Sequence, residues 1–418
     1  MRQSGAVTEI TRNSQTIEKA HQNTLERHKL QQLRSRFPRF FHLLGILDFC
    51  RRMNSESRTA DITMASLFEP LSLRSVQFSN RVFVSPMCQY SSKDGFANDW
   101  HLVHLGTRAV ARAGLVFTEA TAVTPAGRIT AADLGVWKDA HVDFLSRIVQ
   151  FVQSQGAIAG MQLAHAGRKA STDLPWKGGA PLGPSEGGWS PIYGPSPVAF
   201  ASGHQIPQEL SVSQIQQTVA AFKDAAQRAL AAGFQIVEIH AAHGYLLHEF
   251  LSPLSNQRTD QYGGSFENRI RFVCEVAAAI REVWPDALPL AIRISCTDWV
   301  EGGWDIEQSV ELARKLKPIG VDFVDCSSGG LVPNAVIPVG PGFQTQFAER
   351  IRRDAAIPTG SVGLITSPQQ ADTIIRTGQA DAVLLAREFL RHPYWPLHAA
   401  RALHHKIAWP PQYERARD

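Results

Sequence analysis

Two histidines and a tyrosine lie close together in one short segment, at His240, His243 and Tyr245. Two imidazoles at this spacing could bind a metal, but the same segment has no carboxylate or cysteine to complete the ligand set. They could instead donate hydrogen bonds to a carbonyl or nitro oxygen, and so stabilise the negative charge that develops when a conjugated double bond accepts hydride. Tyr245 could then protonate the other carbon. One buried histidine is usually satisfied by the backbone, but the three residues together favour a functional site.

A second group of residues has the types that would bind an anionic cofactor. Arg293 lies inside an apolar run, where a guanidinium is costly unless an anion meets it. It could stabilise the negative edge of a reduced flavin, while Gln162 could hydrogen-bond the pyrimidine edge. A structural ion pair with a neighbouring carboxylate explains Arg293 equally well. Ser361, Gly363 and Arg387 could form a cradle of backbone N–H groups and a guanidinium for a phosphate.

Cys88 and Tyr90 come after another short apolar run. A lone cysteine after a strand usually serves packing, and this is the better interpretation from the residue alone. Beside a flavin, however, a thiol would contact the ring or tune its redox potential. Tyr90 is either an ordinary surface or core aromatic, or a hydroxyl that meets the substrate from the opposite side.

Eight short apolar runs rich in β-branched residues could position these side chains. They are residues 82–84, 115–117, 158–163, 236–239, 290–294, 323–325, 359–362 and 382–385. Amphipathic helical stretches separate most of them, and one such stretch ends before Gly233. The alternation predicts parallel βα units, and eight strands close a (β/α)8 TIM barrel whose chemistry gathers at the strand ends. An open doubly wound sheet would normally have a Gly-x-Gly-x-x-Gly turn after its first strand, and none is present after Val84.

Two segments interrupt this regular alternation. The Gly/Pro-rich residues 173–207 come after the third strand and are too many for a plain barrel connection, so we predict an excursion or lid over the strand ends. Residues 252–269 are dense in turn formers and charges, and we predict a structural clasp for the loop after the fourth strand. Its expected pairing involves Arg258, Asp260 and Arg269.

Composition limits the class of protein. The chain of 418 residues is 44% hydrophobic and 19% charged, which is typical of a soluble globular protein, and no apolar run is long enough to span a membrane. The five cysteines are scattered, which argues against disulfides and metal clusters and favours a reducing, cytoplasmic compartment. Residues 1–63 hold 11 basic and 6 acidic residues, leaving 31 and 32 in the remainder, so the body offers no electrostatic case for binding nucleic acid.

Residues 1–63 differ from the rest of the chain, being rich in polar residues with one apolar patch at residues 40–47. A secretory signal would place a longer apolar stretch near the start, and a mitochondrial presequence would avoid acids such as Glu9 and Glu18. We therefore predict a disordered or partly helical extension, or sequence upstream of a true start at Met64. A partner-binding helix is the weaker alternative. Residues 64–418 are predicted to form a single barrel domain with a C-terminal tail.

Four motifs together resemble the Old Yellow Enzyme family of FMN-dependent ene-reductases. They are Ser-Pro-Met-Cys-Gln-Tyr at residues 85–90, Gln-Leu-Ala-His-Ala-Gly-Arg-Lys at 162–169, His-Ala-Ala-His-Gly-Tyr-Leu at 240–246, and the clasp through Arg269. Each motif is moderately specific, but their joint occurrence, in order, from Leu67 onward is highly specific. Cys88 with Tyr90 resembles the thermophilic-like bacterial subgroup, which has cysteine where other members have threonine.

The resemblance implies a set of site residues. Non-covalent FMN would contact Ser85, Pro86, Met87, Cys88, Ala122, Gln162, Arg293, Ala386 and Arg387. His240, His243 and Tyr90 would meet the substrate oxygen, and Tyr245 would be the proton donor. Arg415 in the tail would reach a neighbouring subunit's site, which implies a homodimer or homotetramer. Ala386 departs from the glycine that many members have before the phosphate-binding arginine, and the 63-residue extension has no counterpart in the family.

The resemblance also implies the reaction. NADPH would supply hydride through FMN to the β-carbon of an electron-poor alkene, namely an α,β-unsaturated carbonyl, a nitroalkene or a quinone. A larger relative that reduces dienoyl thioesters or oxidises amines is one alternative, but no cysteine cluster is present after Tyr245. A flavin-dependent tRNA reductase is a second alternative, and the neutral body argues against it. A catalytically idle flavin-binding barrel is a third, which the intact His240, His243, Tyr245 and Arg293 disfavour.

Overall fold

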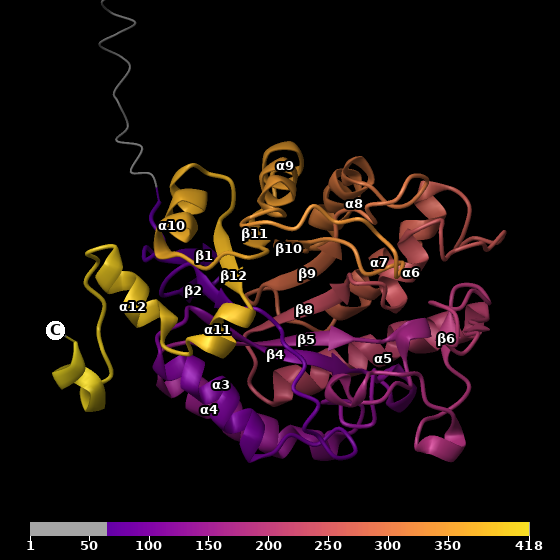
Figure 1. Cartoon of the computed structure of the whole chain (residues 1–418), viewed down its shortest axis with the longest axis horizontal. Helices are drawn as coiled ribbons and strands as arrows, with labels where there is room; N and C mark the ends of the chain where they lie inside the picture. Colours follow the sequence, from indigo (N-terminus) through magenta and orange to yellow (C-terminus); the bar gives the residue numbers. More distant parts are fainter. Residues whose placement is uncertain (1–64, 418) are drawn as a thin grey trace, which may run out of the picture. The chain divides into compact units, whose positions relative to one another are not determined.

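The computed structural model describes residues 65–417, in which eight parallel strands close into a barrel (Figure 1). Going round the barrel, the strands are β3 (Val82–Val84), β4 (Leu115–Ala122), β5 (Ile158–Ala164), β8 (Ile236–Ala241), β9 (Leu290–Ser295), β10 (Phe323–Ser327), β11 (Thr359–Val362) and β12 (Ala382–Leu385). Neighbours in the chain are neighbours in the barrel, and β12 pairs with β3 to close it. The predicted (β/α)8 barrel is confirmed, and every predicted run forms a barrel strand.

Helices come after the strands and cover the outside of the barrel (Figure 1). They are α3 (Asp99–Val110), α4 (Val142–Ser154), α5 (Val212–Ala231), α6 (Leu246–Leu251), α7 (Phe266–Arg281), α8 (Ile306–Ile319), α9 (Thr345–Ala355), α10 (Pro368–Arg376), α11 (Arg387–Arg391) and α12 (Trp395–Ala402). Helix α5 shows how the sequence specifies them. Ser211 caps its start by accepting a hydrogen bond from Gln214 N, and Phe222, Ala226 and Ala229 lie buried on one face.

An apolar plug fills the amino end of the barrel. Phe83, Phe117 and Phe323 point inward from the strands, and Phe78 joins them from the hairpin of β1 (Leu71–Leu73) and β2 (Val76–Phe78). The ring centroids of Phe78 and Phe83 are 5.0 Å apart, and those of Phe83 and Phe323 are 5.9 Å apart. The hairpin therefore seals this end, and the carboxyl ends of the strands are left for a site.

The Gly/Pro-rich segment forms an excursion between β5 and α5, as predicted. It contains two short strands, β6 (Tyr193–Gly194) and β7 (Gln208–Glu209), and in Figure 1 it lies beyond the arrowheads of β4 and β5. Trp189 anchors it by donating a hydrogen bond from Nε1 to Ala126 O, at 3.2 Å. The ring of Trp176 meets Tyr90 edge-on, with centroids 6.0 Å apart. The excursion thus reaches residues that the sequence assigns to the site.

The clasp is confirmed in part. Arg258 pairs with Asp260 and also donates a hydrogen bond to Leu210 O at 2.6 Å, which ties the clasp to the end of the excursion. Arg269 does not join that ion pair. It donates instead to backbone oxygens, including Leu251 O at 2.7 Å. Its three guanidinium nitrogens each donate to a carbonyl oxygen, two on the backbone and one on the Gln308 amide.

Some expectations concern residues outside the described range. The predicted nature of residues 1–63 falls there and stays a prediction. Across residues 65–417, no helix combines the length and the apolar character needed to cross a bilayer.

The aromatic plug generates a stability prediction. Replacing Phe323 with alanine should lower the free energy of unfolding by about 3–5 kcal/mol, because it removes a fully buried ring and leaves a cavity. Chemical denaturation would measure the loss, with Val103→Ala on the exposed face of α3 as the matched control. Equal, small losses in the two variants would contradict the role of the plug.

Candidate active site

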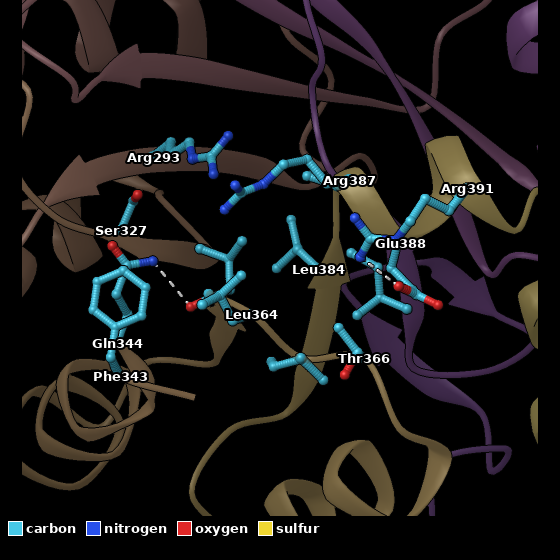
Figure 2. A pocket seen from close by; sticks show the side chains of 15 residues that line it. Arg293, Ser327, Phe343, Gln344, Leu364, Thr366, Leu384, Arg387, Glu388 and Arg391 are labelled. Atoms are coloured by element: carbon cyan, nitrogen blue, oxygen red, sulfur yellow. Dashed lines mark hydrogen bonds and ion pairs between the residues drawn. The ribbon is translucent and has the colours of Figure 1, made fainter. Parts of the chain in front are cut away.

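A cavity opens at the carboxyl ends of β9 to β12 (Figure 2). Four predicted site residues line it, namely Arg293, Gly363, Ala386 and Arg387. Other lining residues were not anticipated from the sequence, and these include Phe343, Gln344, Glu388 and Arg391. Most of the unanticipated residues lie in loops or short helices, where no periodic pattern marks a side chain as facing a cavity.

Positive charge dominates the polar wall of this cavity. Figure 2 shows the guanidinium groups of Arg293 and Arg387 pointing toward one another, from β9 and from the first residue of α11. Within residues 65–417, Arg387 has no ion pair and no hydrogen-bond partner, so its five donors are available to a ligand. Arg391, further out, pairs with Glu388 at 2.6 Å. Such a wall suits a phosphate or another anion.

Because Gly363 has no side chain, a ligand can come close to the backbone in this wall of the cavity. Its φ is +124°, a conformation that L side chains rarely adopt, and a Cβ there would lie 3.0 Å from both Gln344 Nε2 and Phe343 Cε1. Gln344 donates to Val362 O at 3.0 Å and accepts from Ser328 at 2.6 Å, which fixes the loop beside the glycine. No pattern in the sequence marks Phe343 or Gln344 as a site residue.

Ser361 does not belong to the cavity, contrary to the predicted phosphate cradle. Its side chain is fully buried, and its Oγ lies 2.9 Å from Thr345 Oγ1 on α9. Side chains alternate along a strand, and Val362 points into the barrel, so Ser361 must face the outer helix layer. The two-residue period of β11 could have shown this from the sequence.

A polar layer lies inside the barrel above the apolar plug. Gln162, Glu238, Arg293 and Asp325 come from the four adjacent strands β5, β8, β9 and β10, and all four are buried. Arg293 Nε lies 3.0 Å from Asp325 Oδ2, and Gln162 Nε2 donates to Glu238 Oε1 at 2.8 Å. The structural ion pair considered for Arg293 is therefore present, and Arg293 lines the cavity as well.

The two histidines lie at the end of β8, next to Arg293. His240 is the strand partner of Arg293, and its ring centroid is 5.2 Å from that of His243 and 5.0 Å from that of Tyr245. Loss of solvent and the positive charge of Arg293 hold the pKa of both imidazoles well below its usual range. Both rings are therefore neutral near pH 7, and each has one N–H to donate.

The loop that carries His243 is held from several sides. His243 has a left-handed backbone, with φ of +60°, and its Nε2 lies 2.7 Å from Ser327 Oγ. Lys169 Nζ donates to His243 O and to Gly330 O, each at 2.9 Å. Burial lowers the pKa of Lys169 to about 8, although Glu249 opposes the shift. These contacts fix the orientation of the His243 ring and identify Lys169 as a support that the sequence motif contains but does not explain.

Tyr245 borders a second, smaller cavity, together with Ala122 and Asp133. Burial raises the pKa of the Tyr245 phenol, so the hydroxyl keeps its proton at neutral pH. Burial raises the pKa of Asp133 to about 7, although three hydrogen bonds from residues 129 and 130 oppose this. Ala122, a predicted cofactor contact, thus lies beside Tyr245 in this second cavity, which Arg293 and Arg387 do not line.

Cys88 and Tyr90 come after β3 on the same rim. Burial, together with the carboxylates of Glu119 and Asp133, raises the pKa of the Cys88 thiol. Burial also raises the pKa of Tyr90, which has a left-handed backbone with φ of +49°. Both groups are therefore neutral. Cys88 would act as a soft, uncharged contact rather than as a thiolate nucleophile.

The remaining predicted residues fall into two groups. Ser85, Pro86 and Met87 continue from β3 along the rim, and Ser85 Oγ is buried without a hydrogen-bond partner in the described part of the chain. His240 Nδ1 is a second such atom. Buried polar atoms without partners are rare, and they indicate a place for a ligand or water. Arg415 lies on the short helix η6 (Pro411–Ala416), exposed and outside the cavity of its own chain.

These features fit FMN. Arg387 and the backbone around Gly363 could hold its phosphate, and the buried Gln162 and Arg293 could offer an amide and a guanidinium to its ring. Among residues 65–417, no group of three or more His, Cys, Asp or Glu side chains is placed to hold a metal ion.

Comparison with known proteins identifies the family. A model described as the NADH:flavin oxidoreductase / NADH oxidase family matches residues 66–406. The chain belongs to this family. An NADPH dehydrogenase from Geobacillus sp. (strain WCH70) is 49% identical over 351 residues, which cover 84% of this chain and 98% of the relative.

Solved structures agree. Morphinone reductase in complex with tetrahydroNAD is 29% identical, with a TM-score of 0.68, and the match covers 83% of this chain and 93% of that one. An old yellow enzyme homologue from Zymomonas mobilis is 25% identical, with a TM-score of 0.65 and coverage of 82% and 94%. The resemblance to the Old Yellow Enzyme family is confirmed, as are FMN and a nicotinamide as cofactors. Membership of the subgroup with an active-site cysteine stays a prediction.

The neutral histidines of this flavin oxidoreductase generate a spectroscopic prediction. In protein labelled with ¹⁵N-histidine, His240 and His243 should keep the nitrogen shifts of neutral imidazoles from pH 8 down to pH 6, because their pKa lies well below 6.5. Long-range ¹H–¹⁵N spectra measure this, with free histidine in the same buffers as the control. A ring that becomes charged near pH 6.5 would contradict the assigned electrostatics.

A second prediction concerns Cys88. Only the thiolate reacts readily with iodoacetamide, so the raised pKa should make alkylation of Cys88 at pH 7.5 much slower than alkylation of free cysteine. The rate should still be rising above pH 9, as peptide mapping by mass spectrometry would show. Unfolded protein serves as the control for accessibility. A rate that levels off below pH 8 would mean that Cys88 is a reactive thiolate.

Proposed function

We propose that this enzyme reduces the carbon–carbon double bond of electron-poor alkenes with electrons from NADPH. Its substrates would be α,β-unsaturated carbonyl compounds, nitroalkenes and quinones. The observation that carries the proposal is the cluster of His240, His243 and Tyr245, three neutral donors within one strand end, beside the cation of Arg293. The name of the Geobacillus relative, an NADPH dehydrogenase, supports NADPH as the reductant.

The cofactor would be held by residues from several strand ends. Arg387 and the Gly363 backbone would bind the phosphate of FMN, Gln162 the pyrimidine ring, and Arg293 its electron-rich edge. Ser85, Pro86, Met87, Cys88, Ala122 and Ala386 would complete the contacts. When bound, FMN supplies the hydride that it has received from the nicotinamide.

His240 and His243 would bind the substrate oxygen. Each neutral imidazole offers one N–H, and donors held in place before the reaction stabilise developing negative charge without reorganisation. Tyr90, whose raised pKa keeps its hydroxyl protonated, would meet the same oxygen. Ser327 stabilises the His243 ring through the 2.7 Å contact with Nε2. Polarisation of the oxygen makes the β-carbon electron-poor and so directs hydride to that atom.

Tyr245 would protonate the α-carbon. Its raised pKa means that the phenol stays loaded with a proton at neutral pH, and it lies next to His240, which would hold the substrate oxygen. The nicotinamide and the alkene would use the same pocket in turn. This arrangement leads to ping-pong kinetics, because the oxidised nicotinamide must leave before the alkene binds.

The proposal extends to the assembly and location of the protein. We propose a homodimer or homotetramer in which the exposed Arg415 enters a neighbouring subunit's site, and a cytoplasmic location that suits the scattered cysteines. Residues 64–418 would form the working domain.

The test is the double variant His240→Ala/His243→Ala. It should still bind FMN and show a flavin spectrum, but kcat/KM for 2-cyclohexenone should fall by at least about 100-fold, because a held oxyanion donor contributes about 10²–10³. Stopped-flow and steady-state kinetics measure this. Tyr245→Phe is the comparison variant, which should slow turnover while it leaves enone binding intact. Full activity in the double variant would overturn the proposal.

A further inference from the structure

Glu238 is a buried acid for which the proposed chemistry has no use. It lies on β8, two residues before His240, with 0% of its surface exposed, in the polar layer inside the barrel. Arg293, whose charge favours ionisation of Glu238, makes its ion pair with Asp325 instead. Glu238 Oε2 has no hydrogen-bond partner among residues 65–417. Burying a carboxyl group with an oxygen that has no partner is costly, so the presence of Glu238 at this position calls for an explanation.

The contact that Glu238 does make is with Gln162. The two residues are strand partners on β5 and β8, and Gln162 Nε2 donates to Glu238 Oε1 at 2.8 Å. A glutamine amide has a donating end and an accepting end. Because Glu238 takes the donating end, the accepting end, Gln162 Oε1, is turned away from it. In the described part of the chain nothing donates to that oxygen.

We infer that Glu238 is a positioning residue that holds the Gln162 amide with its carbonyl oxygen, rather than its NH₂ group, toward the FMN ring. The pyrimidine ring of a flavin has one N–H donor, at N3, flanked by two carbonyl acceptors. A glutamine that presents an acceptor matches N3–H, whereas a flipped amide would match a carbonyl. The inference rests on the proposed contact between Gln162 and FMN.

The state of Glu238 is compatible with this task. Burial and the nearby Asp325 raise its pKa, against the lowering effects of Arg293 and of the hydrogen bond from Gln162. A proton on Oε2 leaves Oε1 as the acceptor, and the layer then holds one guanidinium and one ionised carboxylate. If residue 238 only filled space, we would expect an apolar side chain there, because a side chain of similar volume would avoid the cost of desolvating an acid.

Two variants separate positioning from packing. Glu238→Leu removes the acceptor that orients Gln162 and keeps the volume filled. The exchange variant Gln162→Glu/Glu238→Gln, studied at a pH at which the new acid is ionised, restores the contact in reverse. The new amide donates to one carboxylate oxygen, and the other oxygen presents an acceptor toward FMN whichever way the group rotates. The exchange variant therefore tests whether restoring the orientation of the acceptor also restores the contact with FMN.

The experiment uses FMN labelled with ¹⁵N and reconstituted into each variant, with the N3–H signal read by NMR and the FMN dissociation constant by fluorescence. The wild type should show a slowly exchanging N3–H signal. Glu238→Leu should lose it and bind FMN about five- to tenfold more weakly, as expected for one neutral hydrogen bond. The exchange variant should regain both.

A protected N3–H signal with unchanged affinity in Glu238→Leu would overturn the inference, and so would an exchange variant without the signal. If Glu238→Leu does not fold, the exchange variant alone decides by the presence or absence of the signal. The wild-type sample keeps the two proposals apart. Wild-type protein that binds FMN but fails to reduce enones would overturn the proposed function, and it would leave the N3–H comparison intact.

Discussion

Arg293 and Asp325 lie side by side in the barrel, with Nε and Oδ2 3.0 Å apart and both residues buried. Closure of the eight strands forces their inward side chains into one narrow space, so this cation acts on several groups at once, among them His240, His243 and Tyr245. Loss of solvent first, and this positive charge second, lower the pKa of His240 and of His243, so both imidazoles are neutral donors. It also gives the wall beside Arg387 the positive charge that an anionic cofactor requires. One buried guanidinium thus shapes both the cofactor side and the substrate side of the site.

Much of this arrangement can be predicted from sequence pattern alone. Short β-branched runs separated by helical stretches predict the barrel, and a parallel barrel brings strand ends to one rim. That rule is sufficient to bring His240, Arg293 and Arg387 together, although they are far apart in the chain. The prediction succeeds because two-residue and 3.6-residue periods reflect burial directly, and because charged residues inside apolar runs are conspicuous.

Other parts of the site depend on contacts that no local pattern encodes. Phe343 and Gln344 line the cavity because the loop after β10 folds back against Gly363. Lys169 supports the His243 loop through two backbone carbonyls, and such contacts leave no mark on residue type. Ser361 is the opposite case. Its position near a strand end suggested a phosphate contact, but strand alternation turns it toward α9, and this could have been read from the sequence.

The central claim is that this family member passes hydride from NADPH to an electron-poor alkene in one pocket. An anaerobic titration of the full chain tests it most directly. We predict that NADPH bleaches the yellow flavin band, and that 2-cyclohexenone then restores the band while an equal amount of cyclohexanone forms. A protein that NADPH bleaches but that no enone, nitroalkene or quinone recolours would contradict the account.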